Sequence, residues 1–190
     1  MRPVKGWPIL IFLALVAVAV GLSVPAAAAL GGLVDLGAVQ GVFLALLWLL
    51  LFYAALILLY RLFLWRWPLP EGEIPEGSRE ERIYHVYLLF YLLFFYPPLR
   101  SRLLPVPLLR LVYQALGARM GPDSYSAGLL MDPPLIELGA RTLVGEDAIV
   151  FAHAIEGRRL SHARVRIGSG VTIGARAILM SGVEVGDGAL

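Results

Sequence analysis

The chain contains no cysteine in its 190 residues. Without thiols it has no disulfide framework, no thiolate metal site and no cysteine nucleophile. It also has only three histidines, of which His153 and His162 lie in the C-terminal half. A carbonic anhydrase needs three histidines that converge on zinc, so we set that enzyme class aside and expect no metal.

Charged residues are few. They make up 16% of the chain, and the formal net charge is only +2. The sequence shows no arginine stripe interleaved with aromatic residues in a soluble fold, so nucleic acid is not an expected partner. A P-loop is also absent, because the Gly-rich stretch 168–174 lacks the Lys-Ser/Thr pair of that phosphate-binding motif.

Apolar residues are in excess: they make up 59% of the chain, and they concentrate in its first hundred residues. Two apolar runs, 7–30 and 42–64, each exceed the roughly 20 residues that cross a bilayer. Tyrosine and tryptophan cluster toward the end of the second run, as they do in an interfacial aromatic belt. We therefore predict two transmembrane helices within residues 1–67.

Basic residues lie at the outer ends of this pair. Arg2 and Lys5 precede the first run, Arg61 and Arg66 close the second, and the linker between them carries Asp35 and no basic residue. The positive-inside rule therefore predicts a multi-pass protein of the bacterial inner membrane, with its C-terminal part in the cytoplasm. Alternatively, the first run is a cleaved signal peptide, since basic, apolar and small residues follow in that order. The second run would still lead to the cytoplasm.

Two segments separate the apolar runs from the C-terminal part. Residues 68–82 form a polar, Pro/Gly-rich connector. Residues 83–118 hold a Tyr- and Phe-rich stretch too short for a span, then an amphipathic stretch that we expect to stop at Gly117. These helices lie in the membrane interface, or they pack on the spans or the C-terminal domain. In the first case three arginines would face anionic head groups. They are Arg100, Arg102 and Arg110.

A six-residue repeat occupies much of residues 119–190. Seven hexads begin with an aliphatic residue and carry a small residue at the fifth position. The first positions are Leu138, Val144, Val150, Ile167, Ile173, Leu179 and Val185. A period of six is typical of a parallel β-helix in which both positions point inward. Three hexads make one coil, so Ile167 should lie beneath Val185. The predicted fold class is mixed, with transmembrane and interfacial α-helices followed by a parallel β-helix.

The repeat breaks once. Val150 and Ile167 are 17 residues apart, one fewer than a full coil requires. Either one coil is irregular there or a loop leaves the stack. His153 lies just before the break and His162 lies inside it. Irregular segments on a repetitive scaffold are where function tends to be located.

The stretches PPLIELGARTLVGEDAIVFAHAIEGRRL and VRIGSGVTIGARAILMSGVEVGDGA resemble the hexapeptide-repeat acyltransferases, a superfamily of CoA-dependent enzymes. They resemble in particular the acetyltransferases that modify cell-surface polysaccharides. The order of apolar segments, LRLVYQALGARMG and a His-containing coil is also similar to the acyltransferase-like C-terminal region of some peptide synthetases. The resemblance covers about 116–190. It implies a left-handed coil and a homotrimer, and it implies that the β-helix is incomplete at its C-terminus.

The resemblance also implies a reaction. An acyl group, most directly acetyl, would move from acetyl-CoA or another acyl-CoA to a hydroxyl or amine of a surface glycan, a lipid-linked acceptor or an amine acceptor. Arg158 and Arg159 would meet the phosphates of CoA. A different class stays open, a non-catalytic membrane-anchored scaffold or remnant, because similar repeats also serve in scaffolds.

In this family a histidine acts as general base on the acceptor, and His153 occupies the position that resembles it. A neutral imidazole can take the acceptor proton during attack on the thioester. Glu156 or Asp132 would orient the ring and fix its tautomer. His162 is the less favoured candidate for the base.

Overall fold

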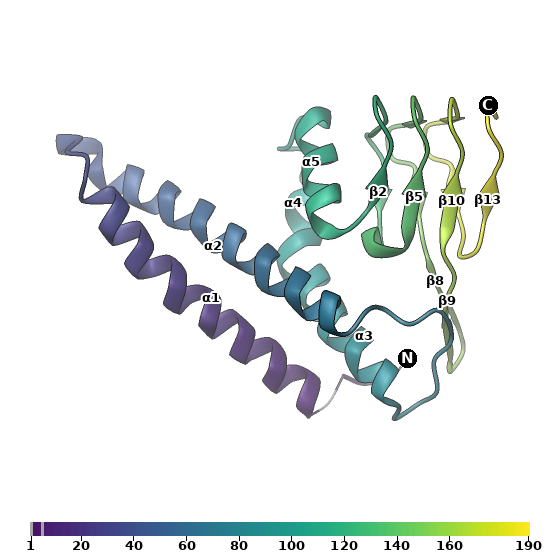
Figure 1. The fold of residues 1–190 in the computed structure, drawn as a ribbon, viewed down its shortest axis with the longest axis horizontal. Coiled ribbons are helices and arrows are strands. Elements are labelled where there is room, and N and C mark those ends of the chain that lie inside the picture. Colours follow the sequence, from purple (N-terminus) through teal and green to yellow (C-terminus); the bar gives the residue numbers. More distant parts are fainter. Residues whose placement is uncertain (1, 5) are drawn as a thin grey trace.

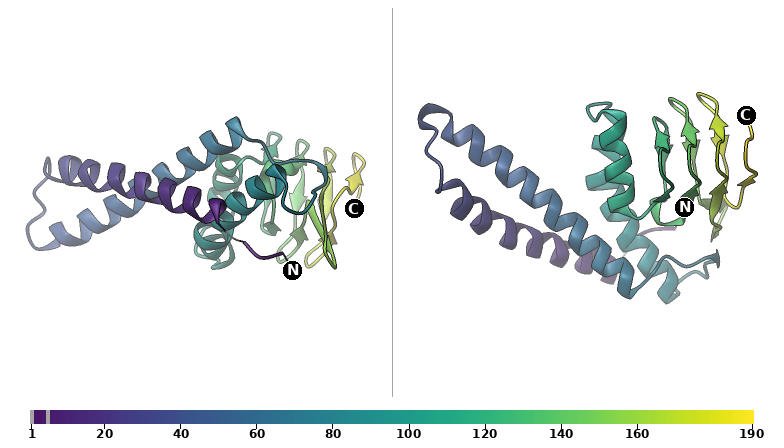
Figure 2. Two further views of the ribbon diagram at one scale, coloured as in Figure 1. Left: turned by 90° about the horizontal axis from the view of Figure 1, so that it is seen from below. Right: turned by 45° about the horizontal axis from the view of Figure 1, so that its top comes forward.

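The computed structural model describes residues 2–4 and 6–190, so Lys5, expected before the first span, lies outside the described residues. A long helical hairpin projects from a block of short strands, with shorter helices between the two (Figure 1). Both views in Figure 2 show the same arrangement, with the C-terminus on the side of the block away from the hairpin. Arg2 lies against the segment that follows the hairpin, since its Nη1 donates to the Ile74 carbonyl at 2.9 Å.

The hairpin consists of α1 (Trp7–Gly31) and α2 (Gln40–Arg66), joined through a 3-10 turn, η1 (Gly37–Val39). At the tip, the Gln40 side chain donates from Nε2 to the Gly31 carbonyl at 2.9 Å. Both helices are long and apolar enough to cross a membrane. Only 17% and 11% of their most apolar windows are buried within the protein, so most of their apolar surface faces outward.

A capped helix follows the connector. α3 (Arg79–Phe90) begins after Ser78, whose hydroxyl accepts from the Glu81 N–H at 3.0 Å. The Glu81 carboxylate in turn accepts from the Gly77 N–H at 2.6 Å. This reciprocal arrangement is close to a capping box and satisfies backbone donors at the start of the helix. α3 therefore begins within residues 68–82, which the sequence predicted to be a polar connector.

The helix continues from α3 through a π-helical turn, η2 (Tyr91–Phe95), into α4 (Tyr96–Arg100). One face packs on the hairpin, where the Phe90 ring meets Phe12 edge to face with centroids 5.1 Å apart. The other face reaches the strands, since the Tyr91 hydroxyl donates to the Leu130 carbonyl at 2.8 Å. These helices thus join the hairpin to the C-terminal block.

The last helix, α5 (Val106–Leu116), stops at Gly117, which confirms the predicted end. Gly117 has φ of 115°, a left-handed conformation that favours glycine. A Cβ here would also collide with the Arg61 guanidinium and crowd Pro134. The C-cap of α5 therefore lies directly against the end of α2.

The three arginines expected at head groups have partners within the protein. Arg102 pairs with Asp147 at 2.7 Å, and Arg110 Nη1 donates to the Ser124 carbonyl at 2.5 Å. Arg100 contacts the Tyr96 hydroxyl. Their positions are set by contacts inside the chain.

The C-terminal strands are short, with two to four residues each. They are β2 (Arg119–Met120), β3 (Tyr125–Ser126), β4 (Leu129–Leu130), β5 (Ile136–Leu138), β6 (Leu143–Val144), β7 (Ile149–Val150), β8 (His153–Glu156), β9 (Arg159–His162), β10 (Val165–Ile167), β11 (Thr172–Ile173), β12 (Ile178–Leu179) and β13 (Glu184–Val185). A 3-10 turn, η3 (Pro133–Leu135), precedes β5. Over the described residues they form parallel sheets in the orders β13-β10-β5-β2, β11-β6-β3 and β12-β7-β4. An antiparallel sheet, β1-β9-β8, adds β1 (Gly72–Glu73) from the connector.

The predicted left-handed parallel β-helix is wrong. Within residues 2–4 and 6–190 the strands form separate short parallel sheets and an antiparallel one, and no closed solenoid is formed. The physical reason is that ladder hydrogen bonds are confined to two or three residues per parallel strand, and the β8–β9 hairpin interrupts the run. The fold class is therefore helices plus several short sheets.

The hexads nevertheless predicted burial and one pairing. Ile167 pairs with Val185, as the repeat predicted. The first positions of the other hexads, from Leu138 to Leu179, are all buried. The break in the repeat is the β8–β9 hairpin, which leaves the parallel sheets and lies beside them (Figure 1). The hexad pattern thus identified the core positions, although the closed solenoid was wrong.

Candidate active site

His153 and Asp132 lie together, as two of the predicted site residues. His153 Nδ1 is 2.6 Å from Asp132 Oδ2, and the His153 side chain is 19% exposed. Asp132 precedes η3, and His153 opens β8, so the pair joins two segments that are 21 residues apart in the sequence. Because a carboxylate accepts, Nδ1 carries the proton in neutral His153 and Nε2 keeps its lone pair.

The Asp132 carboxylate is held by several donors. The side chain is 2% exposed, and Oδ2 also accepts from the backbone N–H groups of Ala152 and His153 at 3.0 and 3.1 Å. Oδ1 lies 3.2 Å from the Tyr87 hydroxyl, which also reaches the Met131 carbonyl at 2.9 Å. Groups other than the imidazole therefore hold the carboxylate in place, and the carboxylate in turn orients the imidazole.

The two groups shift each other's pKa. Burial alone raises the pKa of Asp132, but the His153 hydrogen bond and charge outweigh it, so this pKa lies below its ordinary value. Burial lowers the pKa of His153, but its hydrogen bond to Asp132 and that charge outweigh it, so this pKa is raised. The pair stabilises an imidazolium that forms at His153.

His162 has a different environment from His153. It is 1% exposed, its Nδ1 lies 3.0 Å from the Pro70 carbonyl, and its ring is 4.9 Å from that of Tyr84. Nε2 is buried and has no hydrogen-bond partner in the described part of the chain. Burial lowers the pKa of His162. A buried ring that anchors the connector is poorly placed to meet a substrate.

The other predicted site residues lie further along the β8–β9 hairpin, where Arg158 and Arg159 line the same cavity as His153. Glu156 is exposed and faces Arg159 across β8 and β9. Arg158 pairs with Glu76 at 2.6 Å, and Arg159 pairs with Glu73 at 3.0 Å. The structure therefore brings together Asp132 and His153, whereas the two arginines bind the connector.

Two hollows adjoin His153. A cavity of about 210 Å³ lies between α3 and the β8–β9 hairpin, and its walls include His153, Leu88 and Ile155. An open groove of about 510 Å³ lies on another side, along α4 and the β4-β7 edge. Met131 lines both, and the Phe151 ring in the groove meets the His153 ring edge to face at 5.5 Å. The imidazole thus lines the cavity directly, whereas the groove is next to it through Met131 and Phe151.

Sequence reasoning missed the contribution of α3. Tyr87 contacts Asp132, and His85 lines the same cavity as His153. Burial lowers the pKa of His85. No short motif marks a tyrosine that supports a carboxylate 45 residues away. The Ser78 and Glu81 pair is a capping signal in the sequence, and it predicts the start of α3.

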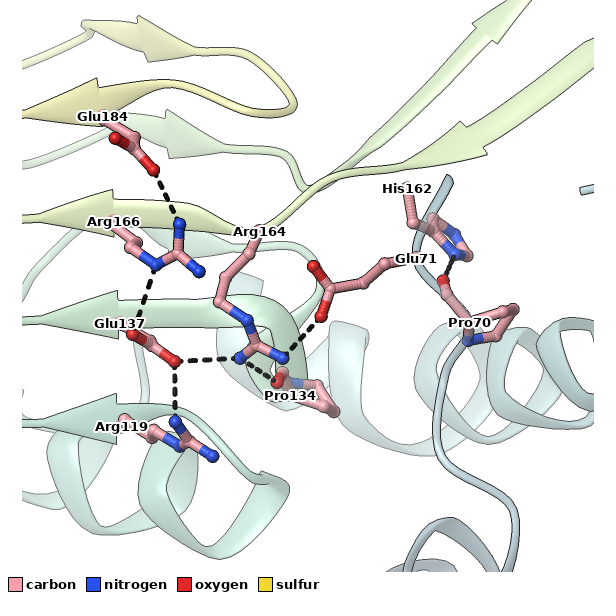
Figure 3. A network of polar contacts seen from close by, with 9 residues as sticks. All are labelled: Pro70, Glu71, Arg119, Pro134, Glu137, His162, Arg164, Arg166 and Glu184. Atoms are coloured by element: carbon pink, nitrogen blue, oxygen red, sulfur yellow. Dashed lines mark hydrogen bonds and ion pairs between the residues drawn. The ribbon is translucent and has the colours of Figure 1, made fainter. Parts of the chain in front are cut away.

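Charged side chains also form a ladder on one sheet, from Arg119 through Glu137 and Arg166 to Glu184 (Figure 3). Arg164 lies beside it and bridges Glu137 at 3.0 Å and Glu71 of the connector at 2.8 Å. The same view shows His162 at Pro70. Among the described residues, no group of three or more His, Cys, Asp or Glu is placed to hold a metal ion.

The chain is similar over part of its length to a known protein. The chain is 34% identical over 61 residues to a Bacillus subtilis (strain 168) protein named "Putative acetyltransferase YvoF". The match covers 32% of this chain, and the chain spans only 36% of the length of that relative. No family model matches the chain, and no solved structure matches it.

Proposed function

We propose that this protein is a membrane-associated acyltransferase that moves an acetyl group from acetyl-CoA to a hydroxyl or amine acceptor, with His153 as general base. The observation that carries the proposal is the 2.6 Å contact between His153 Nδ1 and the buried Asp132 carboxylate. A histidine held this way by a fixed carboxylate is suited to proton transfer. The name of the Bacillus subtilis relative supports acetyl transfer.

The proposed step uses both ring nitrogens. Nε2 takes the proton of the acceptor O–H or N–H as the acceptor oxygen or nitrogen attacks the thioester carbonyl carbon. The C–S bond then breaks, and the departing CoA sulfur receives the proton from Nε2, which restores neutral His153. Asp132 keeps Nδ1 protonated and stabilises the transient imidazolium through its charge. The balance is one acyl group and one proton exchanged between acceptor and CoA.

The two hollows suggest how two substrates reach one base. Both hollows are lined by arginines, with Arg158 and Arg159 in the cavity and Arg100 and Arg102 in the groove. Phosphates bind arginine readily, and the groove is the larger of the two, at about 510 Å³ against about 210 Å³, so we assign it to the CoA side of the reaction. The acceptor would then approach through the cavity. Arg158 and Arg159, which pair with connector carboxylates and line the cavity, would then lie on the acceptor side.

Membrane insertion of α1 and α2 is part of the proposal. Its support is the outward-facing apolar surface of both helices and the basic residues Arg61 and Arg66 at the end of α2. We place the remainder of the chain in the cytoplasm, where acyl-CoA is found. A reporter fused after Arg82 should be active only on the cytoplasmic side. Activity on the outer side would contradict both the topology and the enzyme.

The homotrimer implied by the resemblance is also part of the proposal. Light scattering of the protein in detergent should give three protomer masses. A monomer mass would exclude active sites shared between subunits.

The enzyme is tested by acetyl-CoA turnover with a supplied sugar or amine acceptor in detergent. His153→Ala should lower turnover by roughly 10²–10⁴-fold, the usual contribution of a positioned base. Arg176→Gln is the control, because its side chain is 85% exposed and lines neither of the two hollows near His153. It should leave turnover nearly unchanged.

Circular dichroism separates chemistry from unfolding in both variants. If folded His153→Ala retains wild-type turnover, His153 is not the base. If the wild-type protein shows no turnover with any acceptor class while remaining folded and membrane-bound, the scaffold alternative is supported instead.

A further inference from the structure

A second cavity, of about 240 Å³, lies where α2 meets α5 and the start of β2. Three arginines from distant parts of the sequence line it: Arg61, Arg119 and Arg164. The other walls are mainly apolar and include Leu64 and Trp65. No carboxylate belongs to the lining within the described part of the chain. The cavity therefore has cationic groups on an apolar surface.

The local acidic residues do not balance these arginines. Glu137 is shared by Arg119 at 2.8 Å and Arg164 at 3.0 Å, and it also approaches Arg166 at 3.7 Å (Figure 3). Glu71 contributes a second contact to Arg164. Over residues 2–4 and 6–190, no ion pair joins Arg61 to an acidic side chain. The cavity thus retains positive charge for an anion.

The position of the cavity indicates the kind of anion. Arg61 lies in the last turns of α2, and the neighbouring Trp65 is 83% exposed. Exposed tryptophan near the end of an apolar helix is typical of the head-group layer of a bilayer. An anion at this depth is most directly the phosphate of a lipid. One guanidinium group can bind two phosphate oxygens at once, so three arginines around one site suit a phosphate.

We propose that the Arg61–Arg119–Arg164 cavity binds the phosphate of an anionic membrane lipid, with the glycerol region against Leu64 and Trp65. The proposal rests on membrane insertion of α2 and is independent of the acyltransferase chemistry. A bound lipid would fix the end of α2 against the C-cap of α5, since Arg61 lies over Gly117.

The test is native mass spectrometry of the full chain in a non-ionic detergent. Phosphatidylglycerol is titrated against phosphatidylcholine, which has a phosphate but no net charge. The wild-type protein should bind phosphatidylglycerol more tightly. Arg61→Gln should weaken that binding about tenfold or more, because a charge-assisted contact is lost. The matched control is Arg66→Gln, which removes the same charge from the same helix.

Arg66 is a suitable control because its guanidinium lies over the Trp67 ring at 5.2 Å and does not line the cavity. It should change binding little. Equal losses in Arg61→Gln and Arg66→Gln would show general surface attraction and overturn the site. Equal affinity of the wild type for both lipids would also overturn it. Should Arg61→Gln misfold by circular dichroism, Arg119→Gln decides, because the Arg119 side chain is 74% exposed.

Inorganic phosphate distinguishes the source of the anion. If it binds to wild type but not Arg61→Gln, and displaces phosphatidylglycerol at equal concentration, the ligand is a free phosphate and the lipid assignment is wrong. Weak displacement supports a lipid. Carbonate extraction of membranes tests insertion of α2 separately, so failure of insertion is distinguishable from failure of the anion site.

Discussion

His153 and His162 face each other across the β8–β9 hairpin, yet their pKa values shift in opposite directions. Burial lowers both. At His153 the direct hydrogen bond to Asp132 outweighs burial, whereas His162 meets the Pro70 carbonyl and its shift stays downward. Two adjacent histidines thus differ because one touches a carboxylate and the other touches a neutral carbonyl.

The first prediction concerns the pH dependence of acyl transfer. Turnover should fall as pH drops through a pKa above about 6.5, because protonated His153 cannot accept a proton. Asp132→Asn should move this inflection to lower pH, because burial then acts without the carboxylate. It should also lower the plateau rate by roughly 10²-fold or more, since orientation and imidazolium stabilisation are lost.

The measurement is the pH profile of kcat/KM for both proteins between pH 5.5 and 8.5. Identical inflections in wild type and Asp132→Asn would show that Asp132 does not set the ionisation of the base. A purely structural role would lower the rate without moving the inflection.

The second prediction concerns stability against pH. Folding lowers the pKa of His162, so its contribution to stability is fully present above about 6.5, the pKa of the unfolded chain, and is lost as pH falls through the lowered pKa. Folding raises the pKa of His153, so its contribution is present at low pH and is lost as pH rises through the raised value. His162→Gln should therefore be most destabilising at high pH, and His153→Gln at low pH.

Urea unfolding in detergent, followed at several pH values for these variants and wild type, checks the two slopes. The free-energy difference from wild type should increase with pH for one variant and decrease for the other. Parallel curves would contradict the opposite pKa shifts.

The third prediction tests the core of the parallel sheets. Leu130 is fully buried in β4, whereas Leu143 in β6 is 45% exposed. Leu130→Ala should lower the free energy of unfolding by about 2–5 kcal/mol, because it leaves a cavity. Leu143→Ala is the same chemical change on the outer face and should cost far less. Equal losses in thermal or urea unfolding would mean that the inward assignment is wrong.

The fourth prediction concerns the start of α3. Ser78→Ala removes the acceptor for the Glu81 N–H and should cost about 0.5–2 kcal/mol. Ser78→Asn keeps a capping side chain and should restore most of the loss. Thermal unfolding followed by circular dichroism compares them, and two equally destabilised variants would exclude a capping role.

Local patterns in the sequence predicted a good part of the fold. Apolar runs long enough for a bilayer correspond to α1 and α2, and the glycine signal ended α5 at Gly117. The hexad spacing predicted the pairing of Ile167 with Val185, because both the repeat and the ladder are local and periodic. It did not predict that the strands form separate short sheets instead of a closed solenoid. That outcome depends on the corners and on the inserted β8–β9 hairpin, and the repeat does not describe either.

The candidate site was predicted only in part, for a similar reason. Asp132 was named with Glu156 as a possible partner of His153, and the sequence could not choose between them. Glu156 is nearer in the chain, but β8 directs it toward Arg159. Tyr87 and the connector carboxylates were missed because their contacts join segments far apart in sequence. Such pairings follow from packing, which single-sequence patterns do not encode.

The connector between α2 and the C-terminal block is tied down along its length. Its β1 pairs with β9, Ile74 donates its N–H to the Leu160 carbonyl at 2.8 Å, and Pro70 meets His162. A connector fixed in this way holds the C-terminal strands in a set position relative to the end of α2. If α1 and α2 cross a bilayer, His153 is held at a fixed distance from the membrane surface and does not move freely relative to it. The acceptors within reach are then those that present their reactive group at that distance.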